Sequence, residues 1–386
     1  MRRGPTGKFQ TTTTVGEKVR AFIPDPLPPD PPLDLGGRLQ VALERAHLAL
    51  GVLDSVSTLL PDPNLFLYSY VRKEAVLSSQ IEGTQSSLSD LLLFEMKAAP
   101  GAPLDDVREV SNYVAALEHG LKRVRADFPL SSRLLREVHG LLLAQGRGAD
   151  KAPGEFRRSQ NWIGGTRPGN ALFVPPPPQE VEGCMAALER YLHARDTGVP
   201  ALVRAGMAHV QFETIHPFLD GNGRVGRLLI TLLLCHDGVL REPILYLSLY
   251  FKEHRKQYYD HLENVRAQGD WEAWMEFFLA GVRETADGAV GTARRLIALF
   301  QKDHGRVERL RNASSALKVL QVLKARPVVS LREASKRSDL SFPTTTTAMH
   351  RLVEMGIAKE LTGRQRNRIF GYGQHLKILS EGTRPL

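Results

Sequence analysis

The spacing of apolar residues constrains this fold more than any other feature of the sequence. Along most of the chain apolar residues recur every three or four positions, which is the pattern of helices packed on a core. Glycine and proline interrupt the pattern after residue 144, where residues 161–174 are predicted to form a β-hairpin around Pro168-Gly169 that is closed by Pro175–Pro178. The predicted helices are 37–60, 64–82, 88–98, 107–125, 131–144, 181–195, 201–215, 224–236, 250–268 and 271–300. A mainly α body with one short β-hairpin is expected.

The first 35 residues are predicted to form an arm rather than a helix. Proline is concentrated in residues 22–32, and proline fixes the backbone angle φ and removes a hydrogen-bond donor. We therefore expect an extended segment that lies along the body.

Size and composition exclude several classes of protein. A chain of 386 residues is expected to hold two or three domains. Its 42% hydrophobic and 24% charged residues are typical of globular proteins and exclude disordered and collagen-like chains. Two cysteines, Cys184 and Cys235, cannot build a disulfide framework. The longest uncharged apolar run, Leu228–Cys235, is too short to span a bilayer, and the start of the chain has no apolar signal segment. We expect a cytoplasmic protein.

The positive charge is concentrated at the C-terminal end. Residues 306–386 hold 16 Lys and Arg against 6 Asp and Glu, a local charge of +10, whereas residues 1–305 carry −1. Such asymmetry predicts an appended module that contacts a polyanion. A merely solvated basic surface is the alternative.

The elements predicted in this basic segment follow the order of a winged helix. A helix over 313–325 precedes a short helix capped by Ser330, a turn at Asp339-Leu340, a helix from Ser341 to Met355, and strands at 357–361 and 368–372. The residues predicted to contact DNA are Thr344 and Thr345 on the second helix of the turn and Arg364 and Arg366 on the wing. Contact with a protein, including a homodimer, is the alternative.

Residues suited to binding phosphate, holding a metal ion and transferring a proton are concentrated between His216 and Arg227. Gly221–Gly223 allows left-handed backbone angles and gathers N–H groups ahead of a helix whose dipole is positive at that end. Arg224 and Arg227 share one face of the first turn, where cations oppose the dipole unless an anion compensates. Asp220 offers oxygen to a Mg²⁺ ion, and His216 has a side chain that exchanges protons near neutral pH. The pattern predicts a phosphate site with a metal and a base.

This segment matches, without a departure, the signature H-x-F-x-[DE]-G-N-G-R-x-x-R of the Fic family. The likeness in segment order extends over roughly residues 20–300. Fic proteins are mostly adenylyltransferases that move AMP from ATP to a protein hydroxyl. By position, His216 resembles the catalytic base, Asp220 the Mg²⁺ ligand, Gly221, Asn222, Gly223 and Arg224 the phosphate cradle, Arg227 the residue that holds the γ-phosphate, and Phe218 the core anchor of the loop.

The resemblance also implies a fold and an order of domains. We expect a Fic-type helical bundle with a β-hairpin flap, followed by a winged helix-turn-helix domain. The expected parts are an N-terminal arm and helical region (1–105), a Fic core with trailing helices (106–305) and the winged helix (306–386).

A second motif resembles the inhibitory [ST]-x-x-x-E-[GN] helix of one class of Fic proteins. It runs from Ser78 to Gly83, with Glu82 at the end of a predicted helix, where a carboxylate is disfavoured by the helix dipole. Pairing of Glu82 with Arg227 would prevent ATP from seating its γ-phosphate. Some relatives use this glutamate to remove AMP, so the reverse activity stays open.

The remaining site residues rest on the same resemblance. Gly164, Gly165 and Phe173 of the predicted hairpin resemble a flap that pairs with an extended target segment. Tyr258 and Tyr259 resemble an aromatic pair that closes the adenine pocket, and Arg266 stands where relatives offer an amide to the base.

The expected function is transfer of AMP from ATP to a Ser, Thr or Tyr hydroxyl of a protein, with Mg²⁺ and with Glu82 as a restraint. Three alternatives stay open. One is a DNA-binding regulator whose Fic body senses nucleotide or modifies only itself. Another is transfer of UMP, phosphocholine or phosphate, and the third is removal of AMP.

Overall fold

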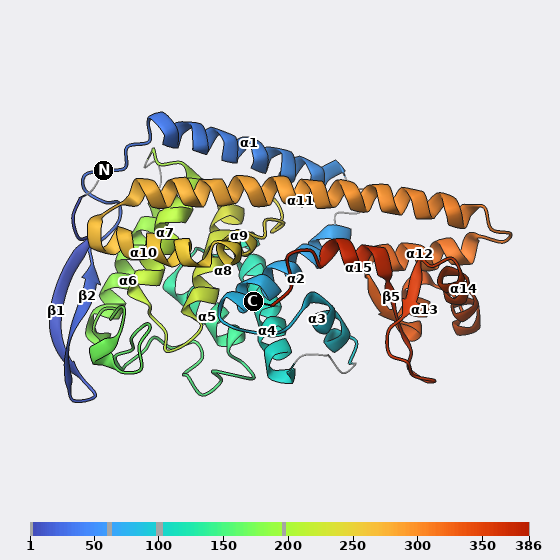
Figure 1. Cartoon of the computed structure of the whole chain (residues 1–386), viewed down its shortest axis with the longest axis horizontal. Helices are drawn as coiled ribbons and strands as arrows, with labels where there is room; N and C mark the ends of the chain where they lie inside the picture. Colours follow the sequence, from blue (N-terminus) through green and yellow to red (C-terminus); the bar gives the residue numbers. More distant parts are fainter. Residues whose placement is uncertain (1–2, 60–63, 98–102, 195–197, 386) are drawn as a thin grey trace. The chain divides into compact units, whose positions relative to one another are not determined.

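A computed structural model describes residues 3–59, 64–97, 103–194 and 198–385 (Figure 1). The chain is mainly helical, as the sequence predicted, and its strands form two small antiparallel sheets. It divides into two compact units whose segments alternate along the sequence. The first unit comprises Met1–Gly51, Ser111–Pro243 and Tyr250–Glu284, and the second comprises Val52–Val110, Ile244–Leu249 and Thr285–Leu386. Within the described ranges, no helix combines the length and the apolar character that a membrane crossing requires.

The first unit is built around α7 and α8, which pack closely against each other. Gly226 of α8 leaves room for the Glu213 side chain of α7, because a Cβ atom there would lie 2.3 Å from its Oε1. The helices that lie wholly or partly in this unit are α1 (Gly37–Leu59), α4 (Leu104–Arg125), α5 (Ser132–Leu142), α6 (Pro178–His193), α7 (Ala201–Ile215), α8 (Asn222–His236), α9 (Ser248–Glu253), α10 (Arg255–Gln268) and α11 (Trp271–Glu308). The predicted helix 250–268 is thus two helices, α9 and α10, that meet at His254.

The N-terminal segment differs from the predicted arm. β1 (Gly7–Thr14) and β2 (Glu17–Pro24) pair as an antiparallel hairpin whose turn residues, Val15 and Gly16, both have positive φ (Figure 1). Two positive φ angles match the twist of a tight hairpin, and the threonine run of β1 is β-branched and suits a strand. The proline-rich composition that follows obscured both strands in the sequence.

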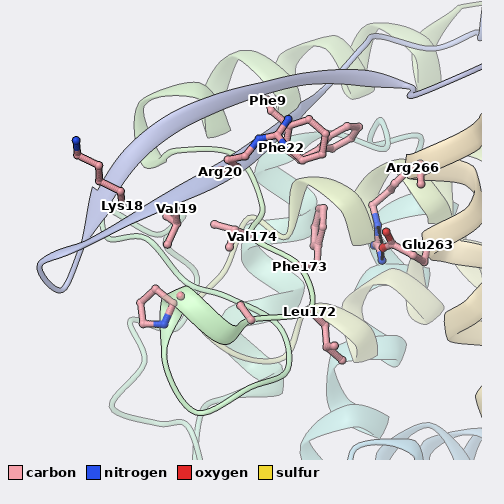
Figure 2. Close-up of a pocket in the computed structure, with 14 residues that line it drawn as sticks. Phe9, Lys18, Val19, Arg20, Phe22, Leu172, Phe173, Val174, Glu263 and Arg266 are labelled. Atoms are coloured by element: carbon pink, nitrogen blue, oxygen red, sulfur yellow. Dashed lines mark hydrogen bonds and ion pairs between the residues drawn. The ribbon is translucent and has the colours of Figure 1, made fainter.

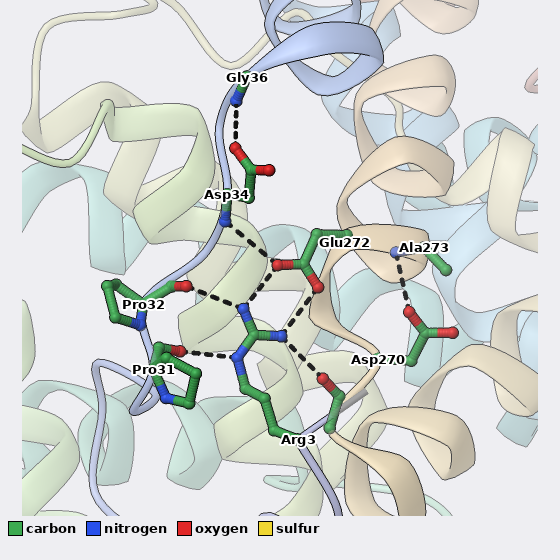
Figure 3. Close-up of polar contacts among 9 residues, drawn as sticks. Arg3, Pro31, Pro32, Asp34, Gly36, Asp270, Glu272 and Ala273 are labelled. Carbon is green, nitrogen blue, oxygen red and sulfur yellow. Dashed lines mark hydrogen bonds and ion pairs between the residues drawn. The ribbon is translucent and has the colours of Figure 1, made fainter. Parts of the chain in front are cut away.

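Arg3 anchors the start of this hairpin. Its guanidinium donates to both carboxylate oxygens of Glu272, at 2.8 and 2.6 Å, and to the carbonyl oxygens of Pro31 and Pro32 (Figure 3). Burial alone would raise the pKa of Glu272, but the hydrogen bonds from Arg3 and from the Asp34 N–H lower that pKa to about 2. Both ends of the hairpin segment are therefore tied to the start of α11.

The second unit joins the C-terminal domain to two helices from the N-terminal third of the chain. Its elements are α2 (Asn64–Ile81), α3 (Leu88–Glu95), α12 (Ser314–Ala325), β3 (Val328–Ser330), α13 (Leu331–Ser338), α14 (Phe342–Glu354), β4 (Ala358–Glu360), β5 (Ile369–Tyr372) and α15 (Gly373–Leu379). The sheet has the strand order β3-β5-β4. The C-terminal elements follow the predicted order, with β3 as an additional strand that the sequence did not indicate.

Buried polar contacts hold α2 inside this unit. Tyr70 donates its hydroxyl hydrogen to the Ala289 carbonyl at 2.8 Å, and the Gln80 amide donates to the carbonyls of Ser86 and Thr383 at 2.9 Å each. The helix that ends next to Glu82 is therefore bonded directly to the C-terminal segment of the chain.

Candidate active site

His216 ends α7 in a left-handed conformation. Its φ is 49° and ψ is 59°, and its N–H donates to the Phe212 carbonyl at 2.9 Å. A non-glycine residue in this region is uncommon and is retained where the surroundings require it. The backbone therefore turns sharply at His216, so that the side chain stands at the junction between α7 and the loop that follows.

Arg157 stabilises this turn through a hydrogen bond to its backbone, and no sequence pattern indicated this residue. The side chain is 3% exposed, and its Nε donates to the His216 carbonyl at 2.9 Å while Nη2 donates to Pro176 at 2.6 Å. Burial lowers the pKa of Arg157 to about 10. The guanidinium binds carbonyl oxygens at the C-terminal end of α7, where a cation is favoured by the helix dipole.

Asn222 closes the loop between α7 and α8. Its Oδ1 accepts from the Phe218 N–H and its Nδ2 donates to the Phe218 carbonyl, each at 2.8 Å. Asn161 also donates to that carbonyl, at 2.9 Å. The sequence analysis placed Asn222 in a phosphate cradle, but its 2%-exposed side chain is occupied by the loop. At this position the first turn of α8 therefore offers a ligand the backbone N–H of Asn222 and not its side chain.

His139 supports the loop from α5 and was also missed. Its Nδ1 accepts from the Gly154 N–H at 2.8 Å, so the neutral ring carries its proton on Nε2, which donates to the Asp220 carbonyl at 3.0 Å. The ring stacks on Phe218 with centroids 3.7 Å apart. Burial lowers the pKa of His139 to about 4. A neutral His139 therefore fixes both Phe218 and the backbone of Asp220.

The first two turns of α8 gather positive charge. The N-cap of this helix is Gly221, with a φ of 76°, and no side chain from the described residues caps it. Arg224 and Arg227 are 1% and 2% exposed, and Arg224 Nη2 lies 3.6 Å from Oδ1 of Asp220. The same Oδ1 accepts from the Gly221 N–H at 2.6 Å. Two buried guanidiniums at the positive end of a helix favour an anion there.

Asp220 is the residue that fits a metal ion. Its side chain is 37% exposed, although it is held by Gly221 and Arg224. A Cβ atom at Gly148 would lie 2.7 Å from its Oδ2, so a glycine is needed opposite the carboxylate. Among the residues that the structure describes, no group of three or more His, Cys, Asp or Glu could hold a metal. A single carboxylate suits Mg²⁺ that is carried by substrate phosphates.

The site segment and the region before it match two family models. Residues 40–122 match the Fic/DOC family N-terminal model and residues 129–234 match the Fic/DOC family model. These two ranges of the chain therefore carry the Fic N-terminal and Fic domains. The loop and both of its supports, His139 and Arg157, lie within the second matched range.

Curated relatives of this chain carry the name protein adenylyltransferase Fic. Those of Culex quinquefasciatus and Aedes aegypti are each 32% identical to it, over 54% and 64% of this chain. The matches cover 39% and 47% of those relatives, so the chain spans less than half of their length.

Solved structures show the same fold. A Fic family protein from Desulfovibrio desulfuricans has a TM-score of 0.57 at 22% identity, and the match covers 86% of this chain and 95% of that one. Fic-1 from C. elegans has a TM-score of 0.51 at 20% identity over 66% of this chain and 74% of that one.

The segment predicted as the flap is less regular than a hairpin. Its strands are reduced to one antiparallel bridge between Ile163 and Phe173, with a 3-10 turn at Pro168–Asn170. Gly164 and Gly165 have positive φ angles of 68° and 72°. The glycines are thus required by the backbone at the tip of the segment.

Phe173 is buried rather than presented to a partner. It is 8% exposed, lies 6.1 Å from the Phe22 ring of β2, and carries the Arg266 guanidinium 4.0 Å above its own ring. β2 is also hydrogen-bonded to the flap segment, because the Phe22 N–H donates to the Val174 carbonyl at 2.9 Å. A cavity of about 310 Å³ lies between the β1–β2 hairpin, the flap and α10 (Figure 2).

The two tyrosines predicted for the adenine pocket do not form an open pair. Tyr258 is 1% exposed and shares a hydrogen bond of 2.8 Å with Nε2 of His209, inside an aromatic cluster with Phe251 and Trp274. Tyr259 is 39% exposed. Arg266 pairs with Glu263 and lies on Phe173, so it is occupied by the flap. Helical spacing could not reveal which of the two tyrosines faces the core.

The inhibitory motif lies in the second unit. Ser78 is fully buried in α2, whereas Glu82 follows the helix end with an exposed side chain, and its N–H donates to the Ser79 carbonyl. Pairing of Glu82 with Arg227 stays a prediction.

The residues predicted to contact DNA differ in their surroundings. Thr345 is fully buried, and its hydroxyl donates to the Ser341 carbonyl at 3.0 Å, so it cannot reach a ligand. Thr344 is exposed but bonded to Ser341. Arg364 and Arg366 are exposed on the loop between β4 and β5.

Proposed function

We propose that this Fic protein transfers AMP from ATP to a hydroxyl side chain of a protein. The observation that carries the proposal is the start of α8, where Arg224 and Arg227 from the first two turns are buried, one short loop after His216. A triphosphate satisfies both the guanidiniums and the helix end. The name of the curated relatives, protein adenylyltransferase Fic, supports the same reaction.

In this proposal the imidazole of His216 is the general base. It accepts the proton of the target hydroxyl while the hydroxyl oxygen forms a bond to the α-phosphorus of ATP. The bond between that phosphorus and the bridging oxygen breaks, and pyrophosphate leaves. Such a displacement depends on alignment and on neutralisation of charge, because the protein forms no covalent intermediate. Arg224 and Arg227 supply the charge, and Asn222, His139 and Arg157 hold the loop in place.

Asp220 would hold Mg²⁺ against the phosphates of bound ATP. The ion would supply additional neutralisation of the negative charge on the leaving pyrophosphate. Asp220 is the exposed carboxylate of the loop, and its backbone is fixed by His139.

We further propose that Glu82 restrains the reaction by competing with the γ-phosphate for Arg227. The carboxylate stands at the negative end of α2, where a cation from outside the helix would stabilise it. Removal of this charge is expected to free Arg227 for ATP.

The test compares α-³²P-ATP with γ-³²P-ATP as donors for the Glu82→Gln protein, alone and in cell lysate. Protein-bound label from the α position alone is expected, and it should increase over the unchanged chain. Glu118→Gln, which removes an exposed carboxylate from α4, is the matched control and should not increase labelling. Label from the γ position would indicate a kinase and contradict the proposal.

The same assay separates the other Fic reactions. Labelling by α-³²P-UTP in preference to ATP would assign UMP transfer, and loss of label from a pre-modified target would assign removal of AMP. Absence of label from every donor in the Glu82→Gln protein would favour a body that only senses nucleotide.

A further inference from the structure

Among the residues that the structure describes, a groove in the second unit is lined by arginines and by no carboxylate. It encloses about 620 Å³ between the end of α3, the start of α13, the start of α14 and the loop that joins β4 to β5. We call it the basic groove and define it by its five cations, Lys97, Arg332, Arg364, Arg366 and Arg368. Two of these, Lys97 and Arg332, lie outside the elements from which the sequence predicted DNA contact.

The cations of the basic groove are not neutralised by acidic neighbours. Within the ranges that the structure describes, Lys97, Arg332, Arg364 and Arg366 are exposed and form no ion pair with a carboxylate. Other arginines of the same unit do form such pairs: they are Arg306 with Asp303, Arg337 with Glu333 and Arg295 with Glu381. These three arginines are paired with carboxylates, whereas in the described part of the chain the four exposed cations of the groove are not.

Glu360 is the carboxylate closest in sequence to the wing arginines, and it is engaged by the loop itself. It accepts from the N–H groups of Thr362 and Gly363 at 2.9 and 2.7 Å, and it does not line the groove. The positive charge of Arg368 also acts on Glu360. Nη2 of Arg368 lies 3.3 Å from Nε2 of His350. Glu360 thus shapes the loop that carries the arginines.

The start of α14 contributes a helix N-terminus to the same groove. Phe342 and Thr346 from its first turns line the groove, and Phe342 is 52% exposed. The threonine hydroxyls of this helix are used internally, because Thr346 donates to the Phe342 carbonyl at 2.8 Å and Thr347 donates to the Pro343 carbonyl at 3.2 Å. With Thr345 buried, the helix offers positive potential but few polar groups for reading bases.

We propose that the basic groove binds the phosphate backbone of duplex DNA without sequence preference. Four of its five cations are arginine, whose planar guanidinium matches phosphate oxygens in pairs. The five cations come from three segments, which are the end of α3, the start of α13 and the β4–β5 loop, and this spread suits a chain of phosphates better than a single anion. The hydroxyls of Thr346 and Thr347 on α14 are engaged within the helix, so the electrostatic contact of the cations with phosphate is expected to dominate.

The test measures binding of the full chain to a fluorescent duplex of arbitrary sequence across a series of salt concentrations. The variant Arg364→Ser/Arg366→Ser should weaken binding by at least about tenfold at low salt, and the slope of log K against log salt should fall in magnitude by about two. Lys318→Ala/Arg309→Ala removes two exposed charges outside the groove, and it should leave affinity and slope nearly unchanged. Melting curves of each variant establish that it is folded.

Several results would overturn the proposal. One is no saturable binding of duplex by the unchanged chain at low salt, and another is equal loss of affinity in the groove and control variants. Preference for a polyglutamate peptide over duplex DNA would assign the groove to a protein. Preference for tripolyphosphate would assign it to a small anion. Affinities that differ by more than about a hundredfold between duplexes of different sequence would contradict backbone recognition.

Discussion

The start of α8 and the basic groove both gather arginines, but they hold them in opposite ways. At the start of α8 the guanidiniums of Arg224 and Arg227 are buried, and Arg157, His139 and Asn222 fix the backbone of the preceding loop through hydrogen bonds of 2.8–3.0 Å. In the groove Arg332, Arg364 and Arg366 are exposed, and two of these three lie on the loop between two short strands. A buried, fixed charge suits one geometry and one reaction, whereas an exposed row suits a partner of variable sequence.

The largest effect is expected at His216. His216→Asn keeps a residue that tolerates the left-handed conformation but removes the base, so AMP transfer by the Glu82→Gln protein should fall by about 10²–10⁴-fold. Initial rates with α-³²P-ATP measure the change. MgATP affinity should stay within a few fold, and a variant with full activity would show that another group is the base.

Loss of the Asn222 hydrogen bonds that support the loop is expected to reduce transfer nearly as much. Asn222→Ala leaves the Phe218 N–H buried without its acceptor, which should cost about 1–3 kcal/mol of unfolding free energy. The Phe218 carbonyl keeps its bond from Asn161, so the fold should persist. Urea unfolding and transfer rates on the same sample measure both losses. Full transfer activity with unchanged stability would show that the loop does not depend on this clamp.

A pH effect is expected from His139. Its folded pKa of about 4 lies below the ordinary 6.5, so the unfolded chain binds a proton that the folded chain does not between these values. This contribution to stability is complete above pH 6.5 and is lost as the pH falls towards 4. His139→Gln should therefore flatten the fall of unfolding free energy in that range. Identical pH profiles of the two proteins, from denaturant titrations, would contradict a buried neutral His139.

The smallest effect is expected on the helix of the groove. Thr344→Ala removes a hydroxyl that is bonded to Ser341, and under backbone recognition it should change duplex affinity by less than about twofold. Anisotropy titrations beside Arg364→Ser/Arg366→Ser make the comparison. A loss as large as that of the arginine variant would show that α14 reads the DNA, and the contrast between the two regions would weaken.

The same contrast explains what the sequence could predict. The loop is continuous in sequence, so glycines, arginines and a histidine at fixed spacing indicated it together. Arg157 and His139 act through burial and come from separate segments, so no local pattern marked them. The β1–β2 hairpin was missed because proline content dominated the composition of the N-terminal segment. Tyr258 and Tyr259 were assigned to the adenine pocket by resemblance alone, and their different exposure depends on which neighbours cover each face of α10, which spacing in the sequence does not show.

Binding of MgATP to the Glu82→Gln protein, followed by isothermal titration calorimetry, tests the central claim most directly. A loop built to hold a triphosphate predicts saturable heat with one site, stronger for ATP than for AMP, and weaker binding by the chain that retains Glu82. No heat with any magnesium nucleotide, from a protein whose melting curve is intact, would contradict the account.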